Sequence, residues 1–561
     1  MRLTLTLMAL SLVAACSSDS PEPRVAAPET RLELTGQGDV IGYVAPEGAH
    51  VWLGLPYAAP PVGDLRWRAP RPAARWDGER EAIEHASRCP QITNVLDEPE
   101  GLEPGILTGS EDCLYLDIYA PPNADNLPVM VWIHGGSNVW GRSSEYDGSQ
   151  LAMDQNVIIV AVQYRLGPLG FMSAHALRDS AETDLDRAAN FALLDLIESL
   201  HWVQAHAEDF GGDPDRVTIF GESAGGHNVA ALLTSPPAAG LFQRAIIQSG
   251  SAATVTRYEA EGLSGNLDNP SSIVLSEIAG GRLTGEALRA ASLERVFDAY
   301  DLSAGSHYEL PRMIEDGLTV PEGGIRAALS NPATFNAVPV ITGTNRDEMR
   351  LFNALNPELS SRALGIFIRP RNRDYFAALS DYQSAMWSVG AVDDLATEMV
   401  AGGHEDVWAY RFDWDEGGSN LIVDSSFMLG AAHAMEIPFV FNRFELFGRL
   451  DPILFNRRNA EGRAALAAQM GQHWADFART GTPGSSWPRW GEEGARMRFD
   501  TPADDGPEVI TGRKGVADIA RALRTDGRLD AAERCVVAEA LADRFFGEGS
   551  SVAERLNCDD A

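Results

Sequence analysis

Short apolar runs alternate with segments of helical periodicity through the middle of this chain, and this alternation limits its possible folds more than any other feature. Apolar residues at 193, 197, 200 and 203 recur at steps of three and four, which is the spacing of one helix face. The Gly-Gly-Asp-Pro stretch at 211–214 ends that helix, and a second helix is expected at 224–233. Such alternation predicts an α/β fold, with a large, mostly parallel central sheet and helices on both faces. The predicted strands are 129–133, 157–162, 217–220, 245–247, 338–341 and 407–412.

The predicted elements belong to one large domain. The sequence shows no internal repeat of solenoid period and no linker that would divide residues 35–545. Hydrophobic residues make up 45% of the 561, which is ample for a large core. We therefore expect a domain over 35–561, with helical insertions at about 255–330 and a helical C-terminal segment at about 515–558.

The first 34 residues have the pattern of an export signal followed by a tether. Arg2 supplies a positive start, and the apolar run 3–13 has signal-peptide length and is too short to span a bilayer. The Val-Ala-Ala-Cys sequence ending at Cys16 resembles a bacterial lipoprotein signal. It implies a signal peptide at 1–15, lipidation of Cys16 and a flexible tether at 16–34. The chain would then be exported and lipid-anchored to the cell envelope, at the outer membrane in a Gram-negative host. The alternative is an ordinary signal peptide with an incidental cysteine.

The other cysteines are Cys89, Cys113, Cys535 and Cys558, which form two groups in the sequence. Export makes two disulfides plausible. A zinc site is the competing interpretation, but no two cysteines have the spacing of a zinc knuckle. We expect no metal.

The balance of charges argues against one class of partner. The chain has 45 basic and 80 acidic residues, a formal net charge of −35. Phosphate backbones would be repelled, so we expect no nucleic-acid partner. The field slightly favours neutral or cationic small molecules.

The segment 221–225, Gly-Glu-Ser-Ala-Gly, fits the pattern G-x-S-x-G. It follows the predicted strand 217–220 and opens the predicted helix 224–233. In this context the pattern predicts a nucleophile elbow, a tight turn that presents the hydroxyl of Ser223 above the sheet. A serine is a poor nucleophile near pH 7, so it needs a base, an acid that orients the base, and N–H donors for the oxyanion.

Candidates for these partners follow other predicted strands. His134-Gly135-Gly136-Ser137 follows strand 129–133, where backbone donors to an oxyanion are expected. For the acid, Asp347 and Glu348 both follow strand 338–341, and the residues alone leave the choice open.

The chain order of nucleophile, acid and histidine leaves His404, His433 and His473 as the base. His404 precedes a strand, at the wrong end, and His473 lies beside Trp474 in a helical pattern that suggests packing. His433 is favoured because it lies in a loop of small residues.

Many further motifs occur in a fixed order between about residue 42 and about residue 500. With them the sequence resembles the type-B carboxylesterases, the α/β-hydrolase branch that includes cholinesterases and bacterial para-nitrobenzyl esterases. The motifs are 53–58 (Leu-Gly-Leu-Pro-Tyr-Ala), 60–63 (Pro-Pro-Val-Gly), 111–116 (Glu-Asp-Cys-Leu-Tyr-Leu), 164–167 (Tyr-Arg-Leu-Gly), 210–214, 220–226, 248–250 (Gln-Ser-Gly), 343–348, 433–441 and 474–477 (Trp-Ala-Asp-Phe).

The resemblance implies a role for each matching residue. It makes Ser223 the nucleophile, Glu348 rather than Asp347 the acid, and His433 the base of a serine esterase that needs no cofactor. The further implied residues are Gly136, Ser137 and Ala224 as oxyanion donors, Glu222 and Ser249 as supports of the catalytic side chains, Cys89–Cys113 as a disulfide, and Arg66 with Glu111 as a buried ion pair.

Two departures from the family pattern bear on the substrate. Ser137 stands where the family has a third glycine; it keeps the N–H, but its Cβ narrows the oxyanion region. No tryptophan lies between Cys89 and Cys113, so a choline ester would lack its main cation–π partner. We therefore expect a general carboxylesterase acting on small ester substrates. The alternatives are a specialised hydrolase of an amide, carbamate or polyketide ester, or a non-catalytic tethered binding protein.

Overall fold

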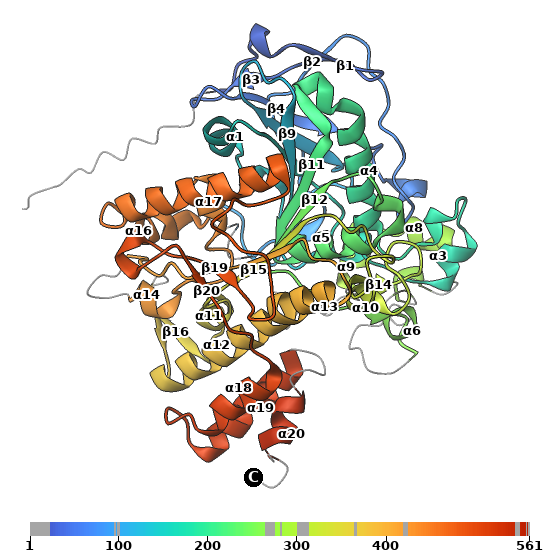
Figure 1. Cartoon of the computed structure of the whole chain (residues 1–561). Coiled ribbons are helices and arrows are strands. Elements are labelled where there is room, and N and C mark those ends of the chain that lie inside the picture. Colours follow the sequence, from blue (N-terminus) through green and yellow to red (C-terminus); the bar gives the residue numbers. More distant parts are fainter. Residues whose placement is uncertain are drawn as a thin grey trace, which may run out of the picture.

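A mixed sheet of eleven strands forms the centre of the molecule (Figure 1). The computed structural model describes residues 23–94, 97, 101–263, 275, 277–280, 283–299, 313–363, 367–418, 424–544, 550–556 and 558. In spatial order the strands are β20 (Glu508–Ile510), β19 (Arg496–Phe499), β18 (Val407–Phe412), β15 (Val340–Asn345), β12 (Arg244–Gln248), β11 (Gly212–Glu222), β9 (Leu127–Ile133), β10 (Ile158–Val162), β8 (Tyr115–Ala120), β4 (His50–Pro56) and β3 (Tyr43–Val44).

The centre of this sheet is parallel and its two edges are antiparallel. Strands β19 to β10 pair in parallel, whereas β20 at one edge and β8, β4 and β3 at the other pair antiparallel. The parallel strands are the apolar runs of the sequence, and the mostly parallel sheet is confirmed. Several boundaries differ from those predicted. Strand β15 spans Val340–Asn345 instead of 338–341, and β11 spans Gly212–Glu222 instead of 217–220. The early start of β11 arises because Gly212 pairs with Leu127. The register shifts between Gly212 and Val217, a stretch that contains Pro214, which has no N–H for the ladder.

Two hydrophobic clusters bury the two faces of the sheet. Alternate residues of β9 show the division: Val129 and Val131 belong to one cluster, and Met130 and Trp132 to the other. Helices α4 (Phe191–His206) and α5 (Ala224–Thr234) cover the first face. Helices α1 (Ser149–Gln155), α15 (Ile437–Phe441) and α17 (Ala460–Thr480) cover the second. Helix α5 and the region of α4 were predicted from the sequence.

Smaller elements surround this core. They are strands β1 (Leu32–Leu34), β2 (Gly38–Ile41), β5 (Glu79–Glu81), β6 (Gln91–Ile92), β7 (Leu107–Thr108), β13 (Val255–Thr256), β14 (Ile314–Glu315), β16 (Ser360–Ala363) and β17 (Phe367–Pro370), with helices α2 (Gly167–Gly170), α3 (His175–Asp179), α6 (Arg257–Ala260), α8 (Gly285–Arg289), α9 (Leu293–Asp298), α10 (Gly324–Leu329), α11 (Met349–Leu355), α13 (Leu395–Ala401), α14 (Ser425–Met428) and α16 (Asp451–Leu454).

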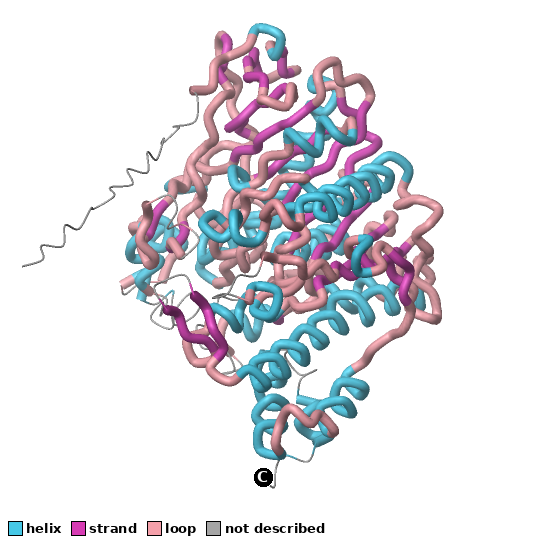
Figure 2. Tube along the Cα trace, turned by 90° about the vertical axis from the view of Figure 1, so that its left-hand side faces the viewer, coloured by secondary structure: helices cyan, strands magenta, loops and turns pink. Residues whose placement is uncertain are grey.

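The C-terminal segment forms a small helical unit of its own (Figure 2). Helices α18 (Val516–Arg524) and α19 (Ala531–Arg544) pack against α12 (Arg373–Ser388), and α20 (Ser550–Leu556) packs against α18 and α19. Side chains such as Leu379 of α12 and Leu523 of α18 build a third hydrophobic cluster between them.

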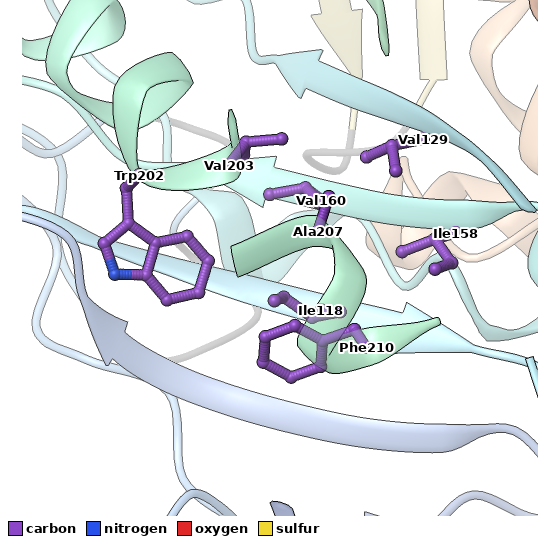
Figure 3. Close-up of a pocket in the computed structure, with 8 residues that line it drawn as sticks. All are labelled: Ile118, Val129, Ile158, Val160, Trp202, Val203, Ala207 and Phe210. Carbon is purple, nitrogen blue, oxygen red and sulfur yellow. The ribbon is translucent and has the colours of Figure 1, made fainter. Parts of the chain in front are cut away.

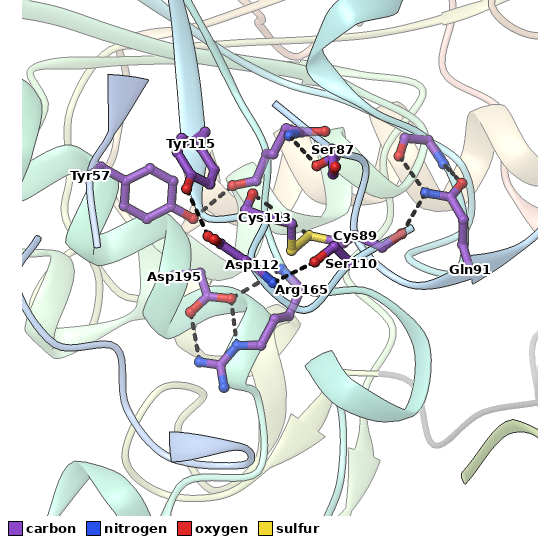
Figure 4. The surroundings of a disulfide bond; sticks show 12 residues. Tyr57, Ser87, Cys89, Gln91, Ser110, Asp112, Cys113, Tyr115, Arg165 and Asp195 are labelled. Atoms are coloured by element: carbon purple, nitrogen blue, oxygen red, sulfur yellow. Dashed lines mark hydrogen bonds and ion pairs between the residues drawn. A yellow bond between two sulfur atoms is a disulfide. The ribbon is translucent and has the colours of Figure 1, made fainter. Parts of the chain in front are cut away.

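Both expected disulfides are present. Cys89 pairs with Cys113, with their Cα atoms 5.1 Å apart, next to the Gln91 side chain that donates to the Cys89 carbonyl (Figure 4). Cys535 of α19 pairs with Cys558, beyond α20, with a Cα separation of 5.5 Å. Both separations lie in the usual range for a disulfide.

A small apolar cavity of about 10 Å³ lies between β9, β10 and the end of α4 (Figure 3). Its volume is close to the smallest that can hold one water molecule.

In the described part of the chain, no helix has the length and apolar character needed to cross a bilayer. The predicted signal peptide and the lipidation site Cys16 lie outside the described residues.

Candidate active site

The candidate catalytic residues lie at one edge of the sheet, where the parallel strands end. Ser223 directly follows β11, and Ser249 directly follows the neighbouring strand β12. Glu348 lies three residues beyond β15, the next strand in the sheet (Figure 1). His433 lies between α14 and α15, in the connection that follows β18. The carboxyl ends of adjacent parallel strands thus bring together residues that are far apart in the sequence.

Ser223 occupies the strained turn that was expected of it. Its backbone has φ 57° and ψ −121°, a conformation that side-chain-bearing residues rarely adopt. The turn crosses β9 closely: a Cβ on Gly225 would lie 1.9 Å from the Ile133 carbonyl oxygen, and one on Gly221 would lie 2.6 Å from it. Only glycine fits at these two positions, so the motif is required by the geometry of the turn.

Glu348 and His433 are in direct contact. The Nδ1–H of His433 donates to Oε2 of Glu348 at 2.5 Å. The other carboxylate oxygen, Oε1, accepts from the Ser249 hydroxyl at 2.6 Å and from the Asn345 N–H at 2.8 Å. Glu348 is completely buried. Three donors therefore fix this carboxylate, and its contact with Nδ1 leaves Nε2 as the ring nitrogen that can accept a proton.

Asp347, the other carboxylate that the sequence allowed as the orienting acid, makes different contacts. Its Oδ2 accepts from Arg346 at 2.8 Å and from the Ala431 N–H at 3.1 Å. Its Oδ1 pairs with Arg350 at 3.2 Å. Asp347 therefore ties the loop of the acid to the loop of His433, and the structure places it away from the imidazole.

The two other candidate histidines contact other parts of the chain. His404 donates from Nε2 to the Val338 carbonyl at 2.9 Å. His473 donates to the Pro483 carbonyl at 2.5 Å and packs against Trp487. Neither contacts Glu348, so the structure brings only His433 to this acid.

Glu222 lies on the other side of the imidazole. Its Oε1 is 3.2 Å from Nε2 of His433, and both side chains are buried. Burial lowers the pKa of His433, but the negative charges of Glu222 and Glu348 outweigh it and raise that pKa to about 9. Burial also raises the pKa of Glu222 well above its usual range. The charge of the Glu222 carboxylate thus favours the protonated imidazole, and the protonated imidazole in turn favours the carboxylate form of Glu222.

The expected oxyanion donors come from two elements. Gly136 and Ser137 follow β9 with φ values of 96° and 55°, and Ala224 is the first residue of α5. Successive residues in such conformations turn their N–H groups towards one side and form an anion-binding hollow. Ser137 adopts the left-handed backbone in spite of its Cβ, and it is exposed.

Two aromatic rings beside His433 were missed from the sequence. Phe352 of α11 and Trp387 of α12 lie with ring centroids 5.1 Å and 4.8 Å from the imidazole. The Trp387 indole N–H also donates to the Ser249 carbonyl at 3.2 Å. Phe352 follows Glu348 by one helical turn, which is a usable signal, whereas no local pattern singles out Trp387.

The expected ion pair between Arg66 and Glu111 is also formed. The guanidinium donates from Nε and Nη2 to the two carboxylate oxygens, each at 2.6 Å. Arg66 is 6% exposed, and it donates in addition to the Ala291 carbonyl. This bidentate pair anchors the N-terminal loops to the segment that carries Cys113.

The profile of the carboxylesterase family matches residues 28–365. The chain belongs to this family. The para-nitrobenzyl esterase of Bacillus subtilis is 34% identical over 500 residues, covering 82% of this chain and 93% of that protein. The human cocaine esterase is 34% identical over 528 residues, with coverages of 86% and 88%.

Solved structures agree with this assignment. The carboxylesterase of Geobacillus stearothermophilus superposes with a TM-score of 0.68 at 30% identity, covering 88% of this chain and 99% of that one. A para-nitrobenzyl esterase gives a TM-score of 0.67 at 29% identity, with coverages of 88% and 98%. The α/β-hydrolase fold is thereby confirmed. This carboxylesterase is an enzyme that hydrolyses carboxylic esters.

Proposed function

We propose that this carboxylesterase works through the triad Ser223, His433 and Glu348 and an acyl-enzyme intermediate. The observation that carries the proposal is the 2.5 Å contact between Glu348 and His433, at the same sheet edge as the strained Ser223 turn. A carboxylate on Nδ1 leaves Nε2 available to accept the serine proton.

Acylation begins when His433 takes the Ser223 proton and the hydroxyl oxygen attacks the ester carbonyl carbon. Among the described residues, no hydrogen bond joins the Ser223 hydroxyl to the imidazole. In the proposed mechanism this contact forms when the substrate binds, because catalytic hydrogen bonds often tighten only in the substrate complex. The N–H groups of Gly136, Ser137 and Ala224 stabilise the oxyanion. His433 then protonates the departing alcohol, and the acyl group stays on Ser223.

Deacylation repeats these steps with water as the nucleophile. His433 takes a proton from water, the hydroxide attacks the acyl carbon, and the proton returns to the Ser223 oxygen as the carboxylic acid leaves. Glu348 stabilises the imidazolium at each stage. The chemistry needs no cofactor or metal.

The proposal is tested by labelling with a fluorophosphonate probe, which reacts with activated serines. We expect one labelled peptide, containing Ser223, and a parallel loss of p-nitrophenyl acetate hydrolysis. A protein that hydrolyses this ester but is labelled at another residue, or is not labelled, would contradict the assignment of the nucleophile.

The pH dependence of the reaction should report on Glu222. The base must be neutral to accept a proton, so kcat/KM should rise with pH up to the raised pKa of His433, about 9. Glu222→Gln removes a negative charge 3.2 Å from Nε2 and so lowers that pKa. We expect the acid limb of the pH profile to move to lower pH by about one unit.

The matched control is Glu145→Gln. Glu145 is another carboxyl whose pKa is raised by burial, to about 7, and it interacts with Asp97 and Arg88 instead of the triad. Its substitution should leave the acid limb in place. An unchanged or upward-shifted limb in Glu222→Gln would show that Glu222 does not set the pKa of the base.

The substrate class follows from the residues around the site and from the relatives. We propose a general carboxylesterase acting on small esters that lack a quaternary ammonium group; its similarity to a para-nitrobenzyl esterase and to a bacterial carboxylesterase supports a general esterase. The chain has no tryptophan between Cys89 and Cys113 to bind a quaternary ammonium group. A screen of p-nitrophenyl esters of increasing acyl length, with a choline ester beside them, defines the range. Faster turnover of the choline ester than of its uncharged isostere would contradict this proposal.

We also propose that the enzyme is exported and held at the cell envelope by lipid on Cys16. The support is the sequence pattern of residues 1–16 and the Ser/Pro-rich stretch between them and the folded part. A serine follows Cys16, which suggests outer-membrane sorting in a Gram-negative host.

Substitution of Cys16 tests the anchor. Cys16→Ala should move the enzyme from the membrane fraction to the soluble fraction with its specific activity unchanged. Mass spectrometry of the parent N-terminus should find a lipidated Cys16. An unmodified N-terminus, or cleavage at another site, would refute the anchor without touching the esterase assignment.

A further inference from the structure

Two asparagines form a hydrogen-bonded pair between the loop that follows β9 and helix α5. The Asn228 side-chain amide donates from Nδ2 to Oδ1 of Asn138 at 2.9 Å. In return, Nδ2 of Asn138 donates to Oδ1 of Asn228 at 3.3 Å. The two residues are 90 positions apart in the sequence, so this reciprocal pair is a tertiary contact.

Each asparagine belongs to one of the two sources of oxyanion donors. Asn138 directly follows Ser137 in the loop after β9, which we call the oxyanion loop (residues 134–140). Asn228 lies in α5, the helix that begins with Ala224 directly after the nucleophile. The amide pair therefore spans the distance between the loop donors and the helix donor.

The oxyanion loop needs such support because its backbone is strained. Gly136, Ser137 and Asn138 have successive φ values of 96°, 55° and 58°. Glycine adopts this region freely, but Ser137 does not, and asparagine tolerates it better than most residues. A loop with serine at the second of these positions keeps this shape only when its surroundings hold it.

The contacts of the pair provide this support. Asn228 is fully buried, and Asn138 is its side-chain partner in both directions. The backbone of Asn138 is held as well, because its carbonyl accepts from the Gly167 N–H at 2.7 Å. The Tyr164 hydroxyl donates to the His134 carbonyl at 2.6 Å, at the start of the same loop. Of these contacts, only the amide pair reaches α5.

We propose that Asn138 and Asn228 are positioning residues that set the Gly136 and Ser137 N–H groups relative to the Ala224 N–H. The hydrogen bonds of the pair hold the oxyanion loop in the left-handed backbone conformation that the Cβ of Ser137 disfavours. This inference rests on the proposed function, since it assigns the pair to the oxyanion hole of that reaction.

The test compares Asn228→Ala, Asn138→Ala and the double variant with the parent. Misplaced oxyanion donors cost transition-state stabilisation more than substrate binding. We expect kcat for p-nitrophenyl acetate to fall by about 10- to 100-fold, with KM within about threefold of the parent. Inhibition by a trifluoromethyl ketone, which forms a tetrahedral adduct, should weaken in parallel. The double variant should lose little beyond either single one, because each substitution breaks the same contact.

Asn336→Ala is the matched control. The Asn336 amide donates to the Leu232 and Ser235 carbonyls, at the opposite end of α5. Its loss removes side-chain hydrogen bonds from the same helix without touching the oxyanion loop. We expect this variant to lose stability but to keep the parent kcat and the parent affinity for the trifluoromethyl ketone.

Hydrogen exchange supplies a readout that does not depend on activity. The amides of residues 135–140 should exchange faster in Asn228→Ala than in Asn336→Ala. If the parent hydrolyses no ester but this difference is found, the proposed function fails and the pair keeps its positioning role. If Asn228→Ala matches Asn336→Ala in loop exchange, or keeps the parent kcat and ketone affinity, the inference is overturned.

Discussion

Replacement of Ser223 by alanine is expected to reduce ester hydrolysis by roughly 10⁴-fold or more, with the fold intact. The proposed mechanism has no other nucleophile at this position, so the residual rate would come only from substrate binding and the oxyanion donors. The side-chain oxygen of Ser223 makes no hydrogen bond in the described part of the chain, so its removal leaves no buried partner unsatisfied. Initial rates and thermal unfolding of parent and variant measure both effects.

Ser235→Ala serves as a control for this experiment. Ser235 follows the far end of α5, and its buried hydroxyl has no hydrogen-bond partner among the described residues. It tests whether the loss of any serine near this helix lowers the rate. We expect Ser235→Ala to retain the parent activity. Activity of Ser223→Ala within tenfold of the parent would exclude Ser223 as the nucleophile.

The parallel centre of the fold could be predicted because its strands are buried on both faces. Such strands appear in the sequence as unbroken apolar runs, and β18 has the limits predicted for it, 407–412. The start of β11 could not be predicted in the same way. Its first residues, Gly-Asp-Pro, have the composition of a turn, and only pairing of Gly212 with Leu127 makes them part of the strand. Tertiary pairing overrides local preference there.

The candidate site was predictable to the extent that it depends on strand ends. Ser223, the glycine-rich loop after β9 and the acid after β15 all follow apolar runs, which places them at one edge. The orientation of neighbouring side chains is not encoded in that pattern. Asp347 and Glu348 are adjacent acidic residues at the same strand end, and only the family resemblance separated them before the structure placed Glu348 against His433.

Residues that reach the candidate site from distant elements could not be predicted from the sequence. Trp387, near the end of α12, packs against His433. Asn228 of α5 donates a hydrogen bond to Asn138 in the oxyanion loop. Neither belongs to a motif of its own, because their roles depend on which elements pack together.

The second large effect is expected for Glu348→Gln, a loss of activity of about 10⁴-fold, by analogy with amide substitutions of the orienting acid in other triads. The hydrogen bonds of Glu348 decide how the new amide would sit. Its Oε1 accepts from Ser249 and Asn345, so the amide oxygen takes that place and the NH₂ faces Nδ1 of His433. Nδ1 then becomes an acceptor, the ring proton moves to Nε2, and the base can no longer take the Ser223 proton.

Asp347→Asn is the matched comparison, since it makes the same chemical change in the adjacent buried carboxylate. Its oxygens pair with Arg346 and Arg350 and accept from the Ala431 N–H, so the amide weakens the link between the two loops. We expect a lower melting temperature and a loss of kcat within about tenfold, because the tautomer of His433 is unchanged. Rates and melting curves of the two variants, measured side by side, separate the roles. Equal losses of kcat, or a larger loss in Asp347→Asn, would assign the orienting acid to Asp347 and contradict the proposed triad.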